Sequence, residues 1–418
     1  MDRNDKELDH RTGNSSDSAA PSSSHGLAGQ LEESRLSEHE MDVKEIIGRN
    51  LRVAREAAEL SQEAFAERLG ISRATLSGFE NGKVAIDSAQ LLKAAQILGT
   101  AVADFFKQDD QQLALLYRAA EDTIPNSAVR SRFRHHCEAY RDLEEIVGVA
   151  DSILPAPEYK YQPMFHSKPY HFAAQVAQSE RERLGLGQLD PIANVFRLLD
   201  ENGVRVFSDE IEQDGVFGLS GFSNRYGSCI LVNLRKHTLE RNIFTLVHEY
   251  AHLLMHRDYY VNPAPPEKKD PEMEEVANCF AANFLVPEAA LRDSLNKTAG
   301  QKSIGLEDVI FLKHHFKVSA QALLRRLRDC GLMGSKDHDD LLAKVKRSAG
   351  DDTKEFAPLQ VDLIGAWRQV CRFQFLARKA ALGGMVSVGK LSELLGQNLV
   401  QTRNDIQSWR KEIASGPA

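Results

Sequence analysis

Two histidines and a glutamate stand at a spacing that suits a metal ion. They are His248, Glu249 and His252, in the sequence FTLVHEYAHLLMH (244–256). In a helix, residues four apart lie one above the other on the same face, so both imidazoles could reach a single ion. Glu249 would project beside that face, where its carboxylate could take a proton from an attacking water molecule. The pattern predicts a zinc site with a general base next to it.

A third ligand is needed, because chance alone produces HExxH in roughly a few per cent of such chains. A second amphipathic segment, PEMEEVANCFAANFLVP (271–287), follows along the chain. Its Glu274 and Asn278 are four apart on one face, above apolar residues that would pack inside. Glu274 is positioned to complete a site of two histidines and one glutamate with an open position for water. Asn278 would orient a ligating imidazole.

The two segments resemble the ImmA/IrrE family of zinc metallopeptidases, in which HExxH is followed by ExxAN/D-x-FAA-x-LLxP. The resemblance covers roughly 165–332 of this chain. It implies an α+β zincin-like fold with Zn²⁺ as cofactor. It also implies that Glu249 is catalytic and that Glu274 is the third ligand.

Alternatives to Glu274 remain open. Glu275 and Glu272 lie on the same segment, and His256 lies four residues beyond His252. A third stacked histidine on a straight helix would point past the ion. The chain lacks the HExxHxxGxxH form, so a metzincin is not expected. Three tyrosines could stabilise an oxyanion, but most such tyrosines simply pack and we assign none a catalytic role: Tyr226, Tyr259 and Tyr260.

Residues 46–106 carry the start and stop signals of several short helices. Ser61 can cap a helix that starts at Gln62, Gly70 can end it in the left-handed conformation, and Ser72 can cap the next helix. A helix, a short turn and a second helix form the geometry in which the second helix enters the major groove. Seven apolar residues are expected to supply the core: Ala66, Ile71, Leu76, Phe79, Leu91, Ala94 and Leu98.

This stretch resembles the XRE (Cro and phage-repressor) helix-turn-helix family, with the landmarks SQ-x-x-x-A-x-x-x-G-x-S and F/I-E-N-G-K intact. The resemblance implies a double-stranded DNA operator as partner and an internal salt bridge between Arg55 and Glu80. Gln62 and Asn81 would touch phosphates, while Arg73 and Ala74, with Ser77 or Gly78, would face base edges. The implied DNA-binding set is Gln62, Ser72, Arg73, Ala74, Ser77 and Asn81.

Charge, cysteine content and hydropathy exclude some classes of protein but do not identify the function. The net charge is −8, and residues 44–107 hold nine Lys/Arg against eight Asp/Glu, so DNA binding must rest on motif geometry. Five scattered cysteines without a CxxC pair exclude a zinc ribbon and indicate free thiols in a reducing compartment. With no long apolar run and a polar amino terminus, we expect a soluble, cytoplasmic protein that does not contact membranes.

A chain of 418 residues is too long for one ordinary domain. Residues 110–150 are expected to be helical, while VRVF (204–207) and SCILVN (228–233) read as strands. The glycine-rich stretch between these two runs suggests turns and strand edges. We expect a multidomain chain: a disordered tail at 1–42, an all-α helix-turn-helix domain at 43–108, a helical connector and linker at 109–164, an α+β zincin-like metallopeptidase domain at 165–332, a linker at 333–356 and a small α-helical C-terminal domain at 357–418.

These features favour a sequence-specific DNA-binding transcription regulator, dimeric on its operator, that carries a zinc metallopeptidase of the ImmA/IrrE type. Its substrate would be a peptide bond in a repressor or partner protein, in a setting of stress response, mobile elements or toxin–antitoxin pairs. The alternative is a non-catalytic regulator or antitoxin whose zincin-like domain senses a ligand, or a partner such as a toxin. Intact Glu249 favours the enzyme, because a purely structural site needs no base.

Overall fold

The computed structural model describes residues 43–58, 60–100, 102–106, 114–119, 123–150, 154–161, 168–261, 271–298, 303–349 and 354–415. The chain forms two compact units, divided between residues 107 and 108. The tail expected at 1–42 lies outside the described residues. Within the described part of the chain, no helix is long and apolar enough to cross a bilayer.

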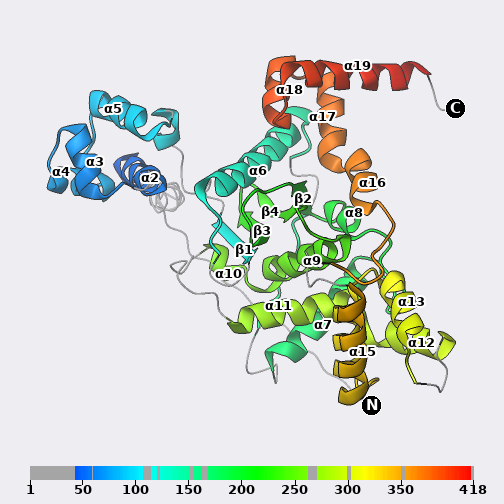
Figure 1. Cartoon of the computed structure of the whole chain (residues 1–418). Coiled ribbons are helices and arrows are strands. Elements are labelled where there is room, and N and C mark those ends of the chain that lie inside the picture. The colour runs from blue at the N-terminus through cyan, green and yellow to red at the C-terminus, as the bar shows by residue number, and fades with distance from the viewer. Residues whose placement is uncertain are drawn as a thin grey trace, which may run out of the picture. The chain divides into compact units, whose positions relative to one another are not determined.

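The first unit is a bundle of short helices, drawn in blue in Figure 1. Ser61 and Ser72 each accept a hydrogen bond from a backbone N–H three residues on, and Gly70 ends the first of the two capped helices with φ 76°. All three cap predictions are confirmed. The elements of this unit are α2 (Val43–Ala57), α3 (Gln62–Leu69), α4 (Arg73–Glu80), α5 (Ser88–Leu98) and the 3₁₀ helix η1 (Val102–Phe106).

The core of this unit contains the residues that the sequence predicts. Ile71 and Leu98 pack at its margin, half-buried. Leu51 and Phe65, from α2 and α3, are additional fully buried members. The buried cluster is Ile47, Leu51, Phe65, Ala66, Leu69, Leu76, Phe79, Leu91, Ala94, Ala95 and Phe105.

A buried ion pair joins α2 to α4. Arg55 donates from Nε to Glu80 Oε1 at 2.6 Å and from Nη2 to Oε2 at 3.2 Å. Gln62 donates from Nε2 to Glu80 Oε2 at 2.7 Å. The side chains of Arg55 and Glu80 are 8% and 1% exposed, so solvent hardly screens the pair. The salt bridge implied by the resemblance is confirmed.

We expect Glu80→Ala to lower the free energy of unfolding of the first unit by about 3 kcal/mol, because Arg55 would stay buried with only the exposed Glu56 and the carbonyl of Leu60 as partners. Glu63→Ala removes an exposed partner of Arg73 at 3.7 Å and should cost about 0–1 kcal/mol. Both tryptophans, Trp367 and Trp409, belong to the second unit. A urea transition seen by far-ultraviolet circular dichroism but not by tryptophan fluorescence therefore reports the first unit. Equal midpoints for the two variants would contradict this expectation.

A four-stranded sheet forms the centre of the second unit. Its strand order is β1-β3-β4-β2, in which β3 pairs antiparallel with β1 and β4, and β2 pairs parallel with β4. The strands are β1 (Ala114–Ala119), β2 (Val204–Asp209), β3 (Val216–Ser223) and β4 (Gly227–Asn233). The strands expected at 204–207 and 228–233 are confirmed.

Helices cover both faces of the sheet (Figure 1). Alternate residues of a strand point to opposite faces, so Val206 and Val232 join one buried cluster while Phe207 and Leu231 join another. The first cluster is shared with α7 (Pro169–Arg183), α8 (Val195–Asp200), α9 (Leu239–Met255) and α11 (Pro271–Leu285). The second cluster is shared with α6 (Ser127–Val147), α17 (Arg372–Leu382) and α18 (Val388–Leu395).

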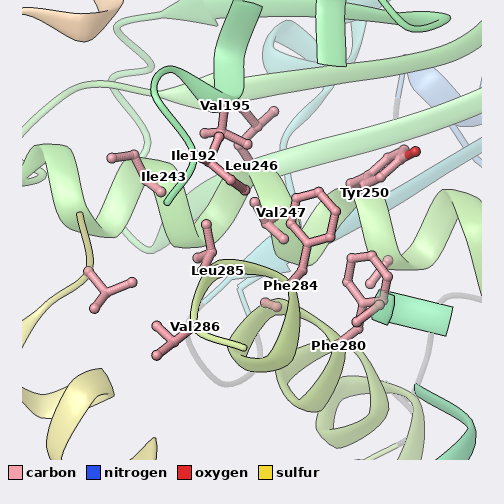
Figure 2. Packing of buried hydrophobic residues seen from close by; sticks show 14 of the residues in the cluster. Ile192, Val195, Ile243, Leu246, Val247, Tyr250, Phe280, Phe284, Leu285 and Val286 are labelled. Carbon is pink, nitrogen blue, oxygen red and sulfur yellow. The ribbon is translucent and has the colours of Figure 1, made fainter. Parts of the chain in front are cut away.

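The contact between α9 and α11 positions the candidate ligands. Figure 2 shows Val247 and Tyr250 of α9 beside Phe280 and Phe284 of α11. The rings of Phe280 and Phe284 are stacked with centroids 5.4 Å apart, and Tyr250 meets both edge-on. This packing fixes the two helices against each other. The remaining helices are α10 (Asp258–Val261), α12 (Glu288–Thr298), α13 (Leu306–Phe316), α14 (Ala320–Asp329), α15 (Ser335–Ala349), α16 (Leu363–Val370) and α19 (Leu399–Ser415).

The helical prediction for 110–150 is wrong in its first part. Residues 114–119 form β1, and the helix α6 begins only after Asn126, whose side chain accepts from the N–H of Val129. The run LALLYRAA fits a helical stripe as well as a strand, because short apolar runs do not distinguish the two. Pairing with β3 decides in favour of the strand.

The linker predicted at 333–356 is also wrong, because it contains the helix α15. His338, Leu341 and Val345 form its buried stripe, which is narrow among many charged residues. The segment from residue 354 onward is held against the rest of the second unit by Lys313 of α13. Lys313 donates from Nζ to the carbonyl of Ala357 at 2.7 Å and to Glu240 Oε1 at 2.9 Å.

The helical segment predicted at 357–418 is present, but not as a separate domain. It belongs to the second unit, and its α17 and α18 pack on the sheet through the cluster shared with α6. Arg372, at the start of α17, donates to Glu144 of α6. The chain therefore has two compact units where the sequence suggested three folded domains.

Candidate metal centre

The helix α9 brings the two histidines of the HExxH motif together. It starts after Thr238, whose side chain accepts from the N–H of Arg241, and it is buried along most of its length. The Nε2 atoms of His248 and His252 lie 3.2 Å apart, and both imidazoles are almost completely shielded from solvent. The spacing of four residues therefore has the consequence expected of it.

Glu274 of α11 closes the group from the other helix. Its Oε2 lies 3.3 Å from His248 Nε2, and its Oε1 lies 3.6 Å from His252 Nε2. Burial would raise the pKa of Glu274, but hydrogen bonding to the two imidazoles holds it far below its usual range. Glu274 is partly exposed, so the site reaches solvent on this side. Glu275 points elsewhere and accepts a hydrogen bond from Tyr170 at 2.6 Å.

The three residues fit a zinc ion by distance and by chemistry. Each offers one ligand atom, and these atoms all lie within 4.8 Å of one another. Two ligands about 2.0–2.1 Å from a tetrahedral zinc ion are about 3.3 Å apart, close to the separations of 3.2, 3.3 and 3.6 Å found here. A zinc ion among these atoms would replace the protons that the imidazoles share with the carboxylate, because metal ligands bind in their deprotonated form.

The outer nitrogens of both histidines have partners of their own. His248 Nδ1 lies 3.0 Å from Asn278 Oδ1, which can only accept, so the ring proton belongs on Nδ1 and Nε2 is left as a ligand. His252 Nδ1 lies 2.9 Å from Nδ1 of His256. Burial, with His252 and His248 close by, lowers the pKa of His256 to about 2. A neutral His256 can accept the proton of His252, so it orients that imidazole and does not join the ligand group.

The carboxylate of Glu249 is held from the sheet. Ser220 of β3 donates its hydroxyl proton to Glu249 Oε2, and Tyr260 of α10 donates to Ser220 Oγ at 2.9 Å. All three side chains are buried. Burial, and next the charge of Glu249, raises the pKa of Tyr260 well above its usual range, so the phenol stays a donor.

The sheet comes very close to α9 at Gly218. A Cβ at this position would lie 2.6 Å from Thr245 Cγ2 and 3.4 Å from Glu249 Cγ. Contacts below 3.0 Å require one of the partners to move, so only glycine allows β3 to lie so near the motif. The glycine-rich stretch is therefore divided between a turn and two strands: Gly215 lies in a turn and Gly227 is the first residue of β4, both with positive φ, while Gly218 and Gly221 lie within β3.

Two profiles of known domains match the chain. The IrrE N-terminal-like domain of the M78 peptidases matches residues 199–328, which contain both motifs of the candidate metal centre. A helix-turn-helix profile matches residues 51–105. The chain is a fusion of an XRE-type helix-turn-helix domain and an IrrE-like domain. Together the two domains indicate a DNA-binding regulator.

Three solved structures are similar to this chain over different shares of its length. The clp gene regulator ClgR from C. glutamicum is 30% identical over 16% of this chain and 86% of its own, with a TM-score of 0.16. The apo competence regulator ComR from Streptococcus vestibularis is 13% identical (81% of this chain, 99% of its own, TM-score 0.15), and ComR from Streptococcus suis is 14% identical (90% and 97%, TM-score 0.15). No curated protein matches this chain significantly.

In the helix-turn-helix domain, the expected DNA-reading residues cluster at α4 and its flanks. Arg73 and Ala74 are exposed in the first turn of α4, and Ser77 lies one turn further on. Ser72 caps α4 by accepting from the N–H of Thr75. Asn81 is exposed and donates to the carbonyl of Ser77 at 2.7 Å, while Gln62 is half-buried against Glu80.

Sequence reasoning missed Ser220 and gave Tyr260 no role. The glycine-rich residues VFGLSGFS suggested turns and strand edges, and no strand was assigned to them, yet Gly218 and Ser220 are two apart, the spacing of one face of a strand. That alternation was the available signal. Of the other two candidate tyrosines, Tyr226 packs in the cluster on the opposite face of the sheet and Tyr259 is 39% exposed.

Proposed function

We propose that this chain is a sequence-specific transcription regulator whose IrrE-like domain is a zinc-dependent metallopeptidase. The observation that carries the proposal is the convergence of His248 and His252 of α9 with Glu274 of α11 on one point. The buried carboxylate of Glu249 lies next to this point, on α9. A structural zinc site is normally closed by four protein ligands, whereas three ligands leave a position for reacting groups. The substrate is a peptide bond in a repressor or partner protein.

Different residues of the chain bind the metal ion, transfer the proton and orient these groups. His248, His252 and Glu274 hold the zinc ion, which when bound acts as a Lewis acid towards a carbonyl and lowers the pKa of water. Glu249 takes a proton from the attacking water and passes it to the leaving amine, so that one water is consumed as the C–N bond breaks. Ser220 and Tyr260 fix the orientation of Glu249, and Asn278 and His256 fix the imidazoles.

The proposed activity can be tested by incubating the purified chain with proteins encoded beside it and with itself. Zinc-loaded and chelator-treated samples are compared on a gel. We expect a discrete product with zinc and none after chelation, because the Lewis acid and its ligands act together.

We further propose that the helix-turn-helix domain binds a palindromic operator as a homodimer, with half-site centres about one helical turn apart. Gln62 and Asn81 would contact phosphates, and Ser72, Arg73, Ala74 and Ser77 would lie at the groove. The support is that α4 is capped and presents Arg73 and Ala74 to solvent.

Arg73→Ala should weaken operator binding by about 1–3 kcal/mol and relax specificity at one base pair, because an arginine at a base edge distinguishes bases. Gln62→Ala should weaken binding to all sequences alike. Arg52→Ala removes an exposed arginine of α2 that pairs with Glu56 and serves as the control. The measurement is a gel shift against operator variants from the upstream intergenic region. Binding that is salt-sensitive but equal for all sequences would contradict the assignment.

A further inference from the structure

The edge of the sheet beside the candidate metal centre is covered by a strand from outside the IrrE-like domain. β1 is the outer strand of the order β1-β3-β4-β2, and β3 is its partner. The match to the IrrE N-terminal-like domain spans 199–328, so it contains β2, β3 and β4 but not β1. Within the matched residues, β3 is therefore an edge strand, and edges of this kind accept further strands.

β3 is also the strand that holds the candidate base. Ser220 donates to Glu249, and Gly218 lies against Thr245 and Glu249. β1 pairs with these same positions, because Leu116 lies opposite Ser220 and Arg118 lies opposite Gly218. β1 also contacts α9 and α10. A chain in the place of β1 therefore passes directly beside the residues that hold Glu249.

Pairing of this kind depends little on sequence. An extended peptide adds to an open strand through main-chain hydrogen bonds, and its side chains supply only the specificity. The register of β1 shifts between Arg118 and Ala119, so the regular ladder is short and ends at Arg118. A short ladder on a single partner is one that another extended segment can replace.

We propose that the open edge of β3 is the substrate-binding edge and that β1 occupies it as an internal inhibitor. The substrate is an extended segment of a protein that pairs antiparallel with residues 216–222 in the place of β1. This inference rests on the peptidase function proposed above. Cleavage then requires β1 to leave β3, without any covalent change in β1 itself.

The first test is a binding experiment that does not depend on catalysis. The probe is a fluorescent synthetic peptide with the sequence of residues 113–120, and the protein is the full chain with 114–119 replaced by alternating glycine and serine. We expect this variant to bind the peptide at least about tenfold more tightly than the wild type, in which β1 competes for the edge. The same peptide with prolines in place of Leu115 and Leu116 should bind neither, because at least one lost N–H faces β3. Equal binding to both proteins overturns the proposal.

A second experiment uses the wild-type chain, so it tests displacement of β1 even if the variant does not fold. A large excess of the peptide should speed hydrogen exchange of the amides in 114–119 while leaving those of β4 (227–233) unchanged. Unchanged exchange in 114–119 overturns the proposal.

Cleavage of casein separates this inference from the peptidase proposal. The variant without β1 should cleave casein at least about tenfold faster than the wild type. Adding Glu249→Gln to this variant should abolish cleavage and leave peptide binding intact. If the peptide binds but no form of the protein cleaves casein, the proposed peptidase function is wrong and the binding edge on β3 stands. If cleavage becomes faster but the peptide does not bind, the binding edge is wrong and the peptidase function stands.

Discussion

Glu249→Gln should keep about one zinc ion per chain while slowing peptide cleavage by about 10²–10⁴-fold, the usual contribution of a general base. Glutamine has nearly the same shape as glutamate and leaves His248, His252 and Glu274 untouched. Its carbonyl oxygen can still accept the hydrogen bond that Ser220 donates to Glu249. The measurement is the rate of product formation by equal amounts of zinc-loaded wild type and variant.

The same variant separates an enzyme from a sensor in cells. If cleavage relieves repression, a reporter of the regulated promoter should stay repressed with Glu249→Gln, although the variant binds DNA normally. The control is Glu275→Ala, which changes a neighbouring carboxylate that contacts Tyr170. Normal regulation by Glu249→Gln, together with no cleavage in any wild-type incubation, would favour a non-catalytic sensor or antitoxin.

Loss of a ligand should have the second large effect. His248→Ala or Glu274→Ala should reduce bound zinc from about one ion to less than about 0.1 per chain, because two ligands no longer define a tetrahedral site. The second unit should lose stability as well. A ligand present at a hundredfold excess over its Kd adds about 2.7 kcal/mol to the free energy of unfolding, and this part is lost with the metal.

Glu275→Ala is the matched control for the third ligand. Glu274 and Glu275 are neighbours on α11, but only Glu274 lies within reach of both imidazoles. Elemental analysis after dialysis should give the same zinc content for Glu275→Ala as for the wild type. Tryptophan fluorescence during urea unfolding should give the two proteins the same midpoint. If Glu275→Ala loses zinc and Glu274→Ala keeps it, the third ligand is Glu275.

The sequence predicted the parts of the candidate site that follow from local rules. Residues four apart on a helix share a face, which brings His248 to His252 and Glu274 to Asn278. A serine before a helix and a glycine after it fixed the limits of α3, because each satisfies backbone groups at a helix end. The salt bridge between Arg55 and Glu80, which are 25 residues apart, was predicted only from the family resemblance, since no local rule pairs them.

The parts that were not predicted depend on contacts between distant segments. β1 is a strand only because β3 lies beside it, about a hundred residues further along the chain. Ser220 reaches Glu249 because Gly218 allows β3 to approach α9. The apolar stripe of α15 is narrow and its charges resemble those of a linker, so only its packing identifies it as part of the second unit. His256 was weighed as a ligand, and its actual partner, Nδ1 of His252, depends on the rotation of two rings.

The zinc content of the purified wild-type protein tests the central claim most directly. The full chain is dialysed exhaustively against metal-free buffer, and zinc and protein are then measured in the same sample. We predict about one zinc ion per chain, restored to the same value after chelation and reloading, because His248, His252 and Glu274 form one site. A value near zero that does not rise on reloading would contradict the metal centre, and with it the proposed peptidase.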